Sequence, residues 1–130
     1  MTALRMDSRL RHRNSKIRLD GPARVLIVDD NEAVADLLRM MLESDFEVVG
    51  IAENGPQAIL GSVETEPDAI VLNCGIHDMS AEHLARWLRD AVPGVRIIAV
   101  GATNGPGKWA DATMERLSVS MVASLLQELV

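Results

Sequence analysis

Short apolar runs alternate with amphipathic segments along most of this chain, and that alternation restricts the fold more than any other feature. Four runs stand out, at 24–28 (RVLIV), 46–52 (FEVVGIA), 69–72 (AIVL) and 95–100 (VRIIAV), and a weaker one, ATMERL, covers 112–117. Short runs in which almost every residue is apolar are typical of strands that are covered on both faces. They predict a buried sheet of five strands.

The segments between these runs repeat apolar residues at helical spacing. The expected helices cover 31–44, Asn54 to about Glu64, Ser80 to the break at Pro93-Gly94, and the segment after Ser118. Asn54, Ser80 and Ser118 are the expected N-caps, because their side-chain oxygens can accept hydrogen bonds from the first helical turn. The expected buried positions are Leu84, Trp87, Leu88 and Ala91 in the third helix and Val122, Leu125, Leu126 and Leu129 in the last.

The repeated strand–helix order implies a parallel sheet with helices on both faces, since parallel neighbours need crossover connections. The predicted fold class is therefore α/β, a doubly wound five-stranded parallel sheet. With 130 residues, one Phe, two Trp and no Tyr, the chain has room for one domain with an aliphatic core. Ligands of such folds bind at the carboxyl ends of the strands. The residues expected there are Asp29, Asp30, Asn73, Gly101 and Arg116.

Charge is unevenly distributed along the chain. Residues 1–24 hold seven basic and two acidic residues, whereas residues 25–130 hold six basic and seventeen acidic residues. Because the basic leader has no aromatic residue and no apolar period, we expect residues 1–23 to be disordered and residues 24–130 to form the folded domain. The acidic body argues against nucleic-acid binding, although a DNA-binding accessory role of the leader remains an alternative.

Cys74 is the only cysteine, which excludes an internal disulfide and a metal site built from several cysteines. A reducing cytoplasm is therefore the expected location. No apolar run approaches the roughly 20 residues that a bilayer span needs. The arginine-rich start also lacks the apolar segment of a secretory signal, so no association with a membrane is expected.

Two adjacent carboxylates, Asp29 and Asp30, follow the first strand. Such a pair is unfavourable unless a cation neutralises it, and oxygen ligands of this kind suit Mg²⁺. The pair alone leaves a second interpretation equally open, in which Asp30 caps the first helix and Asp29 is solvated. The third strand ends at Asn73, a neutral amide that can serve as neither acid, base nor nucleophile.

The segments VLIVDDN, PDAIVLN with GIHDMS, RIIAVGA and ADATMERLSVSMVASLLQEL together resemble the receiver domain of two-component response regulators, the CheY-like superfamily. The resemblance covers about residues 24–130 and implies a flavodoxin-like sheet of strand order 2-1-3-4-5. It also implies that a histidine kinase phosphorylates a carboxylate at the end of the third strand, with Mg²⁺ held by the acidic pair and the phosphoacceptor. A Ser or Thr after the fourth strand and a Lys after the fifth would bind the phosphoryl group.

Taken position by position, the resemblance assigns the Mg²⁺ ligands to Asp29, Asp30, Asn73 and the backbone carbonyl of Gly75. Asn73 falls on the phosphoacceptor position. Its amide oxygen could still bind a metal, but its delocalised lone pair cannot form the acyl phosphate. We therefore expect a weak Mg²⁺ site that lacks a phosphoacceptor.

The positions that would bind and sense the phosphoryl group are altered as well. Gly101, followed by Ala102, stands where the resemblance places the hydroxyl, and Arg116 replaces the lysine with a cation of different geometry. Fifteen positions lead from Gly101 to Arg116, which is too few for the whole of the family's fourth helix. That helix is expected to be shortened or absent.

The loss of the phosphoacceptor, of the hydroxyl and of the full fourth helix predicts an atypical stand-alone receiver. It is expected to bind a protein partner without phosphorylation and not to be an enzyme. No output domain follows Val130 in this sequence, so its effect is expected to pass through contacts. The expected partner is a histidine kinase or a downstream signalling protein, bound near the replaced helix and Trp109, and a homodimer is left open. Two alternatives are a receiver phosphorylated at a non-standard residue and a small-ligand-binding protein that uses the glycine-rich loop Gly101–Lys108.

Other residues near these strands have simpler explanations than catalysis. Asp78 lies in a loop where the family often has a solvated acid, and Cys74 is expected to be a small buried residue rather than a redox sensor. His77 and His83 have no third metal ligand in register. The sequence GPGK at 105–108 lacks the spacing of a phosphate-binding loop and follows the fourth strand instead of the first.

Overall fold

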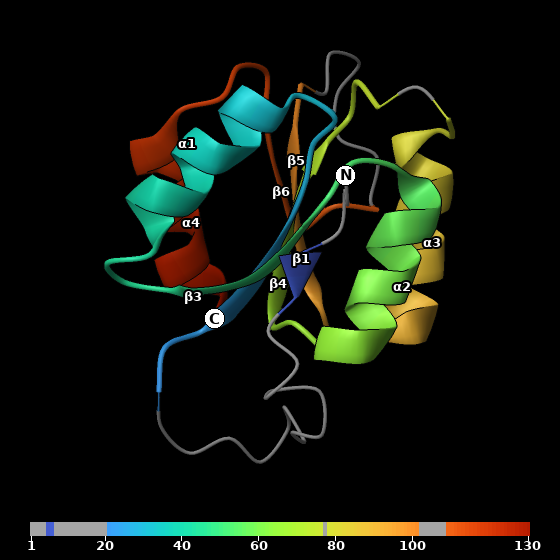
Figure 1. The fold of residues 1–130 in the computed structure, drawn as a ribbon, viewed down its shortest axis with the longest axis horizontal. Helices are drawn as coiled ribbons and strands as arrows, with labels where there is room; N and C mark the ends of the chain where they lie inside the picture. The colour runs from blue at the N-terminus through green and yellow to red at the C-terminus, as the bar shows by residue number, and fades with distance from the viewer. Residues whose placement is uncertain (1–4, 7–20, 77, 102–108) are drawn as a thin grey trace.

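The computed structural model of this chain describes residues 5–6, 21–76, 78–101 and 109–130 (Figure 1). Its strands are β1 (Arg5–Met6), β2 (Arg24–Val28), β3 (Glu47–Ala52), β4 (Ala69–Asn73), β5 (Arg96–Val100) and β6 (Ala112–Met114). Its helices are α1 (Glu32–Leu42), α2 (Gly55–Thr65), α3 (Ala81–Ala91) and α4 (Val119–Leu129). Each of these helices is too short or too polar to span a bilayer, within the part of the chain that is described.

The strands form one sheet in the order β1-β3-β2-β4-β5-β6, and the five strands from β2 onward run parallel. Counted from Arg24, this is the predicted order 2-1-3-4-5, which confirms the flavodoxin-like α/β prediction. The leader differs from the expectation at one place, because Arg5 and Met6 pair antiparallel with Ile51 and Gly50 on the edge of β3. The remaining leader residues up to position 20 lie outside the described residues.

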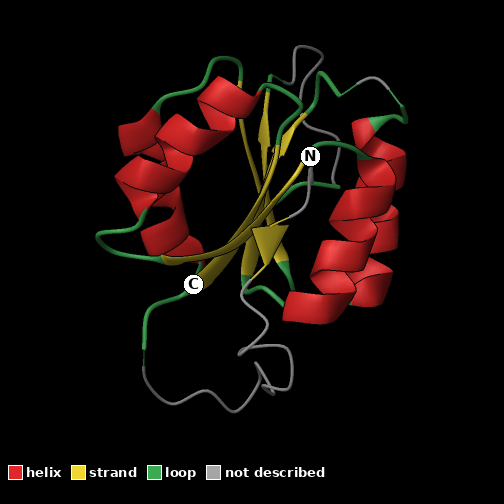
Figure 2. Ribbon diagram, viewed as in Figure 1, coloured by secondary structure: helices red, strands yellow, loops and turns green. Residues whose placement is uncertain are grey.

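Alternate residues of the central strands face opposite helical layers. In β2, Leu26 and Val28 pack in the cluster that includes residues of α2 and α3, whereas Val25 and Ile27 pack in the cluster that includes residues of α1 and α4. The helices accordingly lie in two pairs on the two sides of the sheet (Figure 2). Both clusters are built mainly from aliphatic side chains, as the composition predicts.

Each helix begins after a polar side chain that accepts a hydrogen bond from the first turn. The N-caps are Asn31, Asn54, Ser80 and Ser118, and each accepts from the backbone N–H three residues later. The caps predicted for the last three helices are confirmed. Because Asn31 caps α1, the interpretation in which Asp30 is the cap is wrong.

The buried face of α3 differs from the predicted one. Leu84 and Leu88 are fully buried as expected, but Trp87 is 57 % exposed. Ala81 and Ala85 face the core in its place. Two alanines beside the leucines let the helix lie close to its neighbours, and the large indole is left on the outer side.

The connection between β5 and β6 is described only at its ends. Gly101 and Trp109–Asp111 form no helix, and residues 102–108, on which the rest of that prediction falls, lie outside the described residues. Arg89 of α3 holds the second end of this connection, at Trp109–Asp111. Its guanidinium donates to the carbonyls of Trp109 and Val95 at 2.8 and 2.9 Å and to the carboxylate of Asp111 at 3.0 Å.

The Asp111 carboxylate also accepts a hydrogen bond from the backbone N–H of Ile97 at 2.8 Å. Burial alone would raise the pKa of Asp111, but this hydrogen bond and the nearby Arg89 and Arg96 outweigh it, so that the pKa lies below its ordinary value. The resulting stabilisation is complete above about pH 4, where an unfolded Asp is also ionised. It is lost as the pH falls through the lower pKa of the folded state.

Replacing this carboxylate by an amide should therefore have a pH-dependent effect. We expect Asp111→Asn to lower the free energy of unfolding by about 1–2 kcal/mol at pH 7, and the difference from the wild type to shrink as the pH falls below about 4. Urea unfolding of both proteins at pH 7 and below about pH 4 measures this difference in the free energy of unfolding. The exposed Asp90 on α3 supplies the control, because Asp90→Asn should change stability by less than about 0.5 kcal/mol. An equal decrease in the free energy of unfolding for Asp111→Asn and Asp90→Asn would contradict the role of Asp111.

Candidate functional site

The site predicted from the sequence lies at the carboxyl edge of the sheet, where the adjacent parallel strands β2 and β4 end. Asp29 directly follows β2, and its backbone N–H still donates to the carbonyl of Ala52 at 2.9 Å. This hydrogen bond extends the pairing of β2 with β3 by one residue and keeps the Asp29 backbone in line with the strand. β4 ends at Asn73. The sheet therefore presents these two side chains next to each other.

Asn73 and Asp29 form a direct hydrogen bond. Asn73 Nδ2 donates to Asp29 Oδ1 at 3.1 Å, and the same carboxylate oxygen accepts the backbone N–H of Asn31 at 2.8 Å. Asn73 Oδ1 accepts the backbone N–H of Gly75 at 2.9 Å. A flipped amide would place its oxygen against the carboxylate and its NH₂ group against an N–H donor. The hydrogen bonds therefore determine which way the Asn73 amide points.

The two members of the acidic pair have different environments. Asp29 is only 8 % exposed, whereas Asp30 is exposed. Both hydrogen bonds to the Asp29 carboxylate go to Oδ1, and Oδ2 accepts none from the described residues. The interpretation in which Asp29 is solvated is therefore wrong. A nearly buried carboxylate with one oxygen unused is a favourable position for a cation or a hydrogen-bond donor.

The four predicted Mg²⁺ ligands fit a metal only in part. The carboxylates of Asp29 and Asp30 can offer oxygen atoms, but Asn73 faces Asp29 with its NH₂ group and would have to rotate to present its oxygen. Gly75 lies beside Asn73 in the loop after β4, where its N–H is engaged and its carbonyl is a ligand by prediction only. Within the described ranges, no group of three or more His, Cys, Asp or Glu residues is placed to hold a metal ion.

Gly101 lies beside Asn73, as the sequence predicts. A side chain at Gly101 would place its Cβ 3.7 Å from Asn73 Oδ1, an ordinary van der Waals distance. Gly101 has a φ of +86°, which β-branched residues adopt only with strain. Its backbone N–H donates to the carbonyl of Met114 at 2.8 Å. The position next to the amide is therefore occupied by backbone alone.

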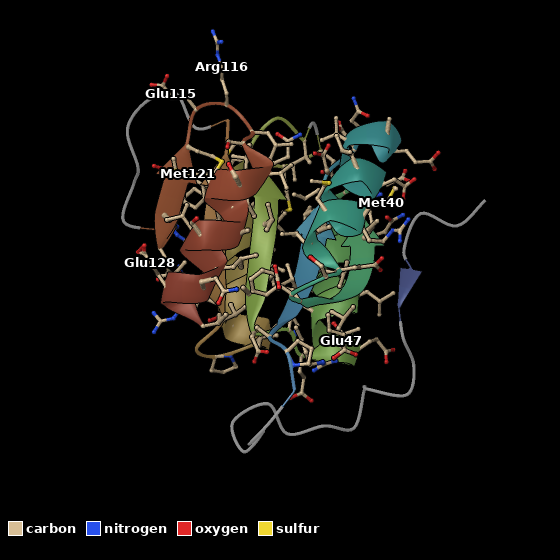
Figure 3. All side chains as sticks on the ribbon, turned by 90° about the vertical axis from the view of Figure 1, so that its left-hand side faces the viewer. Met40, Glu47, Glu115, Arg116, Met121 and Glu128 are labelled. Carbon is tan, nitrogen blue, oxygen red and sulfur yellow. The ribbon has the colours of Figure 1, made fainter. Side chains whose placement is uncertain are left out.

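The structure does not bring Arg116 to the site. Its side chain is exposed, forms no hydrogen bond or ion pair with the described residues, and extends away from the ribbon (Figure 3). β6 ends at Met114, so the residue that directly follows this strand is Glu115, not Arg116. The resemblance assigned the place of the lysine to Arg116, which lies two residues beyond the end of β6. Ala102 lies outside the described residues.

Asp78 has a structural role that the sequence did not reveal. Its two carboxylate oxygens lie 3.2 and 3.0 Å from the backbone N–H of Gly55, the first residue of α2. A carboxylate at a helix N-terminus satisfies a backbone donor and interacts favourably with the helix dipole. A Cβ on Gly55 would collide with the side chain of Met79, so the loop after β4 packs tightly on this helix end.

Cys74 and His83 show no sign of catalytic chemistry. Burial raises the pKa of the Cys74 thiol, which reduces the reactive thiolate at neutral pH. Cys74 is half-buried and packs against the core, in agreement with the structural interpretation. The ring nitrogen Nδ1 of His83 lies 2.8 Å from Oγ of Ser80 at the exposed start of α3. His77 and the GPGK sequence lie outside the described residues.

A pocket that the sequence did not predict opens at this edge of the sheet, between α1 and Leu117 in the connection that leads to α4. It has a volume of about 220 Å³. Its polar lining residues are Asp29, Asn31 and Asn73, and its apolar lining residues are Ile27, Val28, Val34, Leu38, Val71, Val100 and Leu117. The two helices stand side by side in front of the sheet in Figure 3. The pocket itself is lined by Val34 and Leu38 of α1, so it joins the polar edge of the sheet to the side of α1 that faces the strands.

The family model of the response regulator receiver domain matches residues 25–119. Among curated proteins, the chain is 29 % identical over 104 residues to protein-glutamate methylesterase/protein-glutamine glutaminase 5 of Myxococcus xanthus, covering 78 % of this chain and 30 % of that protein. It is 33 % identical over 86 residues to the probable transcriptional regulatory protein TcrX of Mycobacterium tuberculosis, covering 65 % and 37 %. The chain thus spans about a third of the length of these relatives.

Solved structures show the same fold. A CheY-like response regulator receiver domain from Methylobacillus flagellatus matches with a TM-score of 0.74 and 25 % identity, over 85 % of this chain and all of that one. The receiver domain of the sensor histidine kinase PA1611 from Pseudomonas aeruginosa matches with a TM-score of 0.70 and 22 % identity, over 84 % and 98 %. That structure has a magnesium ion coordinated in its active site cleft.

Proposed function

This chain belongs to the family of response regulator receiver domains, and from that premise we propose that it is an atypical receiver that acts through protein contacts without phosphorylation of an aspartate. The observation that carries the proposal is Asn73. Its amide stands at the end of β4, where the family resemblance places the phosphoacceptor, and it donates a hydrogen bond to Asp29. The chain itself thus supplies a neutral partner for the buried carboxylate.

The chemistry of an amide supports this proposal. Phosphoryl transfer to a receiver requires a nucleophilic carboxylate oxygen, and the lone pair of an amide is delocalised into its carbonyl group. The neighbouring position 101 has no hydroxyl that could hold a phosphoryl group, and Arg116 extends away from the ribbon. Asp78, the nearest alternative acceptor in the loop after β4, is engaged with the start of α2.

The remaining parts of the proposal concern surroundings and partners. We infer a binding module and not an enzyme, located in the cytoplasm, whose partner is a histidine kinase or a downstream signalling protein. The partner surface is proposed around the β5–β6 connection, where Trp109 packs partly buried against the core. Where Mg²⁺ binds, Asp29 and Asp30 would hold it weakly, and it would supply charge neutralisation of the acidic pair.

A phosphorylation assay tests the proposal directly. The wild type is incubated with Mg²⁺ and a low-molecular-weight acyl phosphate, and the intact mass is measured. We expect no adduct on the wild type and a gain of one phosphoryl group on Asn73→Asp, because that variant regains the carboxylate. Asn73→Asp combined with Asp29→Asn should lose the adduct again, since the metal site would be incomplete.

Two outcomes would speak against the proposal. A phosphoryl adduct on the wild type would show that the domain still accepts phosphate. If Asp78→Asn then removed that adduct, the acceptor would be the non-standard residue of the alternative hypothesis.

A further inference from the structure

Among the described residues that line the pocket between α1, the sheet and Leu117, Asp29 is the one charged residue, and this makes the chemistry of the pocket specific. Asp29 follows Ile27 by two residues, and Asn73 follows Val71 by two, so the alternation along each strand places the polar pair on the same face as these apolar walls. A ligand in the pocket would therefore contact a carboxylate at one end and aliphatic side chains along its length.

No cation of the described chain occupies this position. Arg116, the residue expected to bring a positive charge, extends away from the ribbon, and Leu117 lines the pocket with an apolar side chain. Asp29 is 8 % exposed and uses only Oδ1 for the hydrogen bonds from Asn31 and Asn73. Its Oδ2 is not one of the buried unpartnered oxygens, so it remains accessible from the pocket, where apolar neighbours strengthen its attraction for a cation relative to bulk water.

The acceptors in the pocket suit an ammonium group. An ammonium has three N–H donors and no acceptor. Asp29 Oδ2 accepts no hydrogen bond from the described residues, and Asn31 Oδ1 accepts a single backbone N–H. Because an amide oxygen has two lone pairs, Asn31 Oδ1 can accept a second hydrogen bond.

We propose that this pocket binds a small primary ammonium compound that carries a short apolar group. Its volume of about 220 Å³ sets the size. An engineered apolar cavity of about 150 Å³ holds benzene, so this pocket has room for an aromatic ring or a chain of about five to seven carbons together with its ammonium group. The proposal does not rest on the loss of phosphorylation, because it depends on the pocket and on Asp29 alone.

Binding of benzylammonium tests the assignment, with benzyl alcohol as its uncharged counterpart of nearly equal size. Each is titrated into the ¹⁵N-labelled full chain at pH 7 with EDTA, and backbone amide shifts are followed. We expect saturable shifts around Asn31 and Val34, a Kd below about 1 mM for benzylammonium, and at least about tenfold weaker binding of the alcohol. Equal affinity for both compounds, or no saturation, would overturn the proposal.

Three variants complete the test. Asp29→Asn should weaken benzylammonium at least about tenfold and leave the alcohol nearly unchanged. Val34→Phe, at a half-buried helix position, should fill the pocket and abolish binding of both compounds, and it keeps the test decisive if Asp29→Asn fails to fold. Glu128→Gln removes one negative charge from the exposed part of α4, outside the pocket, and should leave both affinities unchanged. An equal effect of Glu128→Gln and Asp29→Asn would show non-specific attraction and overturn the proposal.

The same ammonium could also come from a lysine side chain of another protein. Nα-acetyl-lysine N-methylamide presents that group on a peptide backbone and forms the last arm of the titration. If the ligand is a free small amine, we expect this lysine derivative to bind more weakly than benzylammonium, because the peptide groups of the derivative do not fit the pocket. Tighter binding of the lysine derivative would overturn the assignment to a free amine.

Discussion

Asn73→Asp should lower the free energy of unfolding of the metal-free protein by about 1–3 kcal/mol at neutral pH. In the wild type, Asn73 Nδ2 donates to Asp29 Oδ1 at 3.1 Å. An ionised Asp at this position loses the donor and brings a second carboxylate against one that is almost fully buried. Urea unfolding in the presence of EDTA measures this loss.

Mg²⁺ should reverse the effect. A metal ion that binds only the folded state stabilises it by mass action, and three carboxylates form a stronger oxygen site than two. We therefore expect millimolar Mg²⁺ to restore much of the lost stability of Asn73→Asp and to change the wild type little. Asn73→Ala is the matched control, since it removes the donor without adding charge. It should be destabilised less than Asn73→Asp and gain nothing further from Mg²⁺.

This pair of variants also distinguishes two explanations of Asn73. If the amide is only a lost nucleophile, Asn73→Ala should be as stable as the wild type in EDTA. If the amide stabilises the site through its hydrogen bond to Asp29, both variants should be less stable than the wild type, and the charged variant should be clearly the less stable of the two. Equal stability of Asn73→Asp and the wild type in EDTA would contradict the second explanation.

The sequence predicted the four longer parallel strands and the sheet edge at which Asp29 and Asn73 lie, because both follow from local patterns, whereas the strand expected at 112–117 ends at Met114. A buried parallel strand is a run of apolar residues, and its carboxyl end can be identified from the first polar residue, as at Asp29 and Asn73. The hydrogen bond between these two residues could not be predicted from local sequence patterns. It depends on the register between β2 and β4, which is a tertiary contact.

The elements that were missed depend on tertiary packing. The two-residue strand β1 has no pattern of its own and is identified only by its pairing with the edge of β3. Arg116 was placed at the site by the resemblance, although the direction of a side chain after a strand depends on the local backbone. The pocket arises because Val34, Leu117 and Val100 do not fill the space above Ile27, and the sequence pattern does not describe unfilled volume.

The face of α3 was misjudged because alanine gives a weak signal. The pattern of large apolar residues favours an arc through Leu84, Trp87 and Leu88, whereas the structure buries the arc through Ala81, Leu84, Ala85 and Leu88. The two arcs share the leucines and differ in which side of them is covered. This difference has a direct consequence for stability.

Leu88→Ala should lower the free energy of unfolding by about 2–5 kcal/mol, whereas Trp87→Ala should change it by less than about 1 kcal/mol. Leu88 is fully buried in the cluster between the sheet and α3, so its removal leaves a cavity that the rigid strands cannot close. Trp87 is 57 % exposed, so truncating it leaves no enclosed cavity and water can occupy the space. Far-UV circular dichroism should follow the unfolding, because Trp87→Ala removes one of the two tryptophans and would change the emission signal by itself.

The comparison tests the placement of α3 on the sheet and not only the stability of one side chain. If the predicted arc through Trp87 were buried, Trp87→Ala should lower the free energy of unfolding more than Leu88→Ala, since the tryptophan would bury the larger apolar surface. Ala85→Leu provides the opposite test at a position that is fully buried. Because no space remains there for three further carbons, overpacking should destabilise it by about 1–3 kcal/mol. A neutral Ala85→Leu together with a costly Trp87→Ala would mean that α3 is rotated about its axis relative to the arrangement in Figure 1.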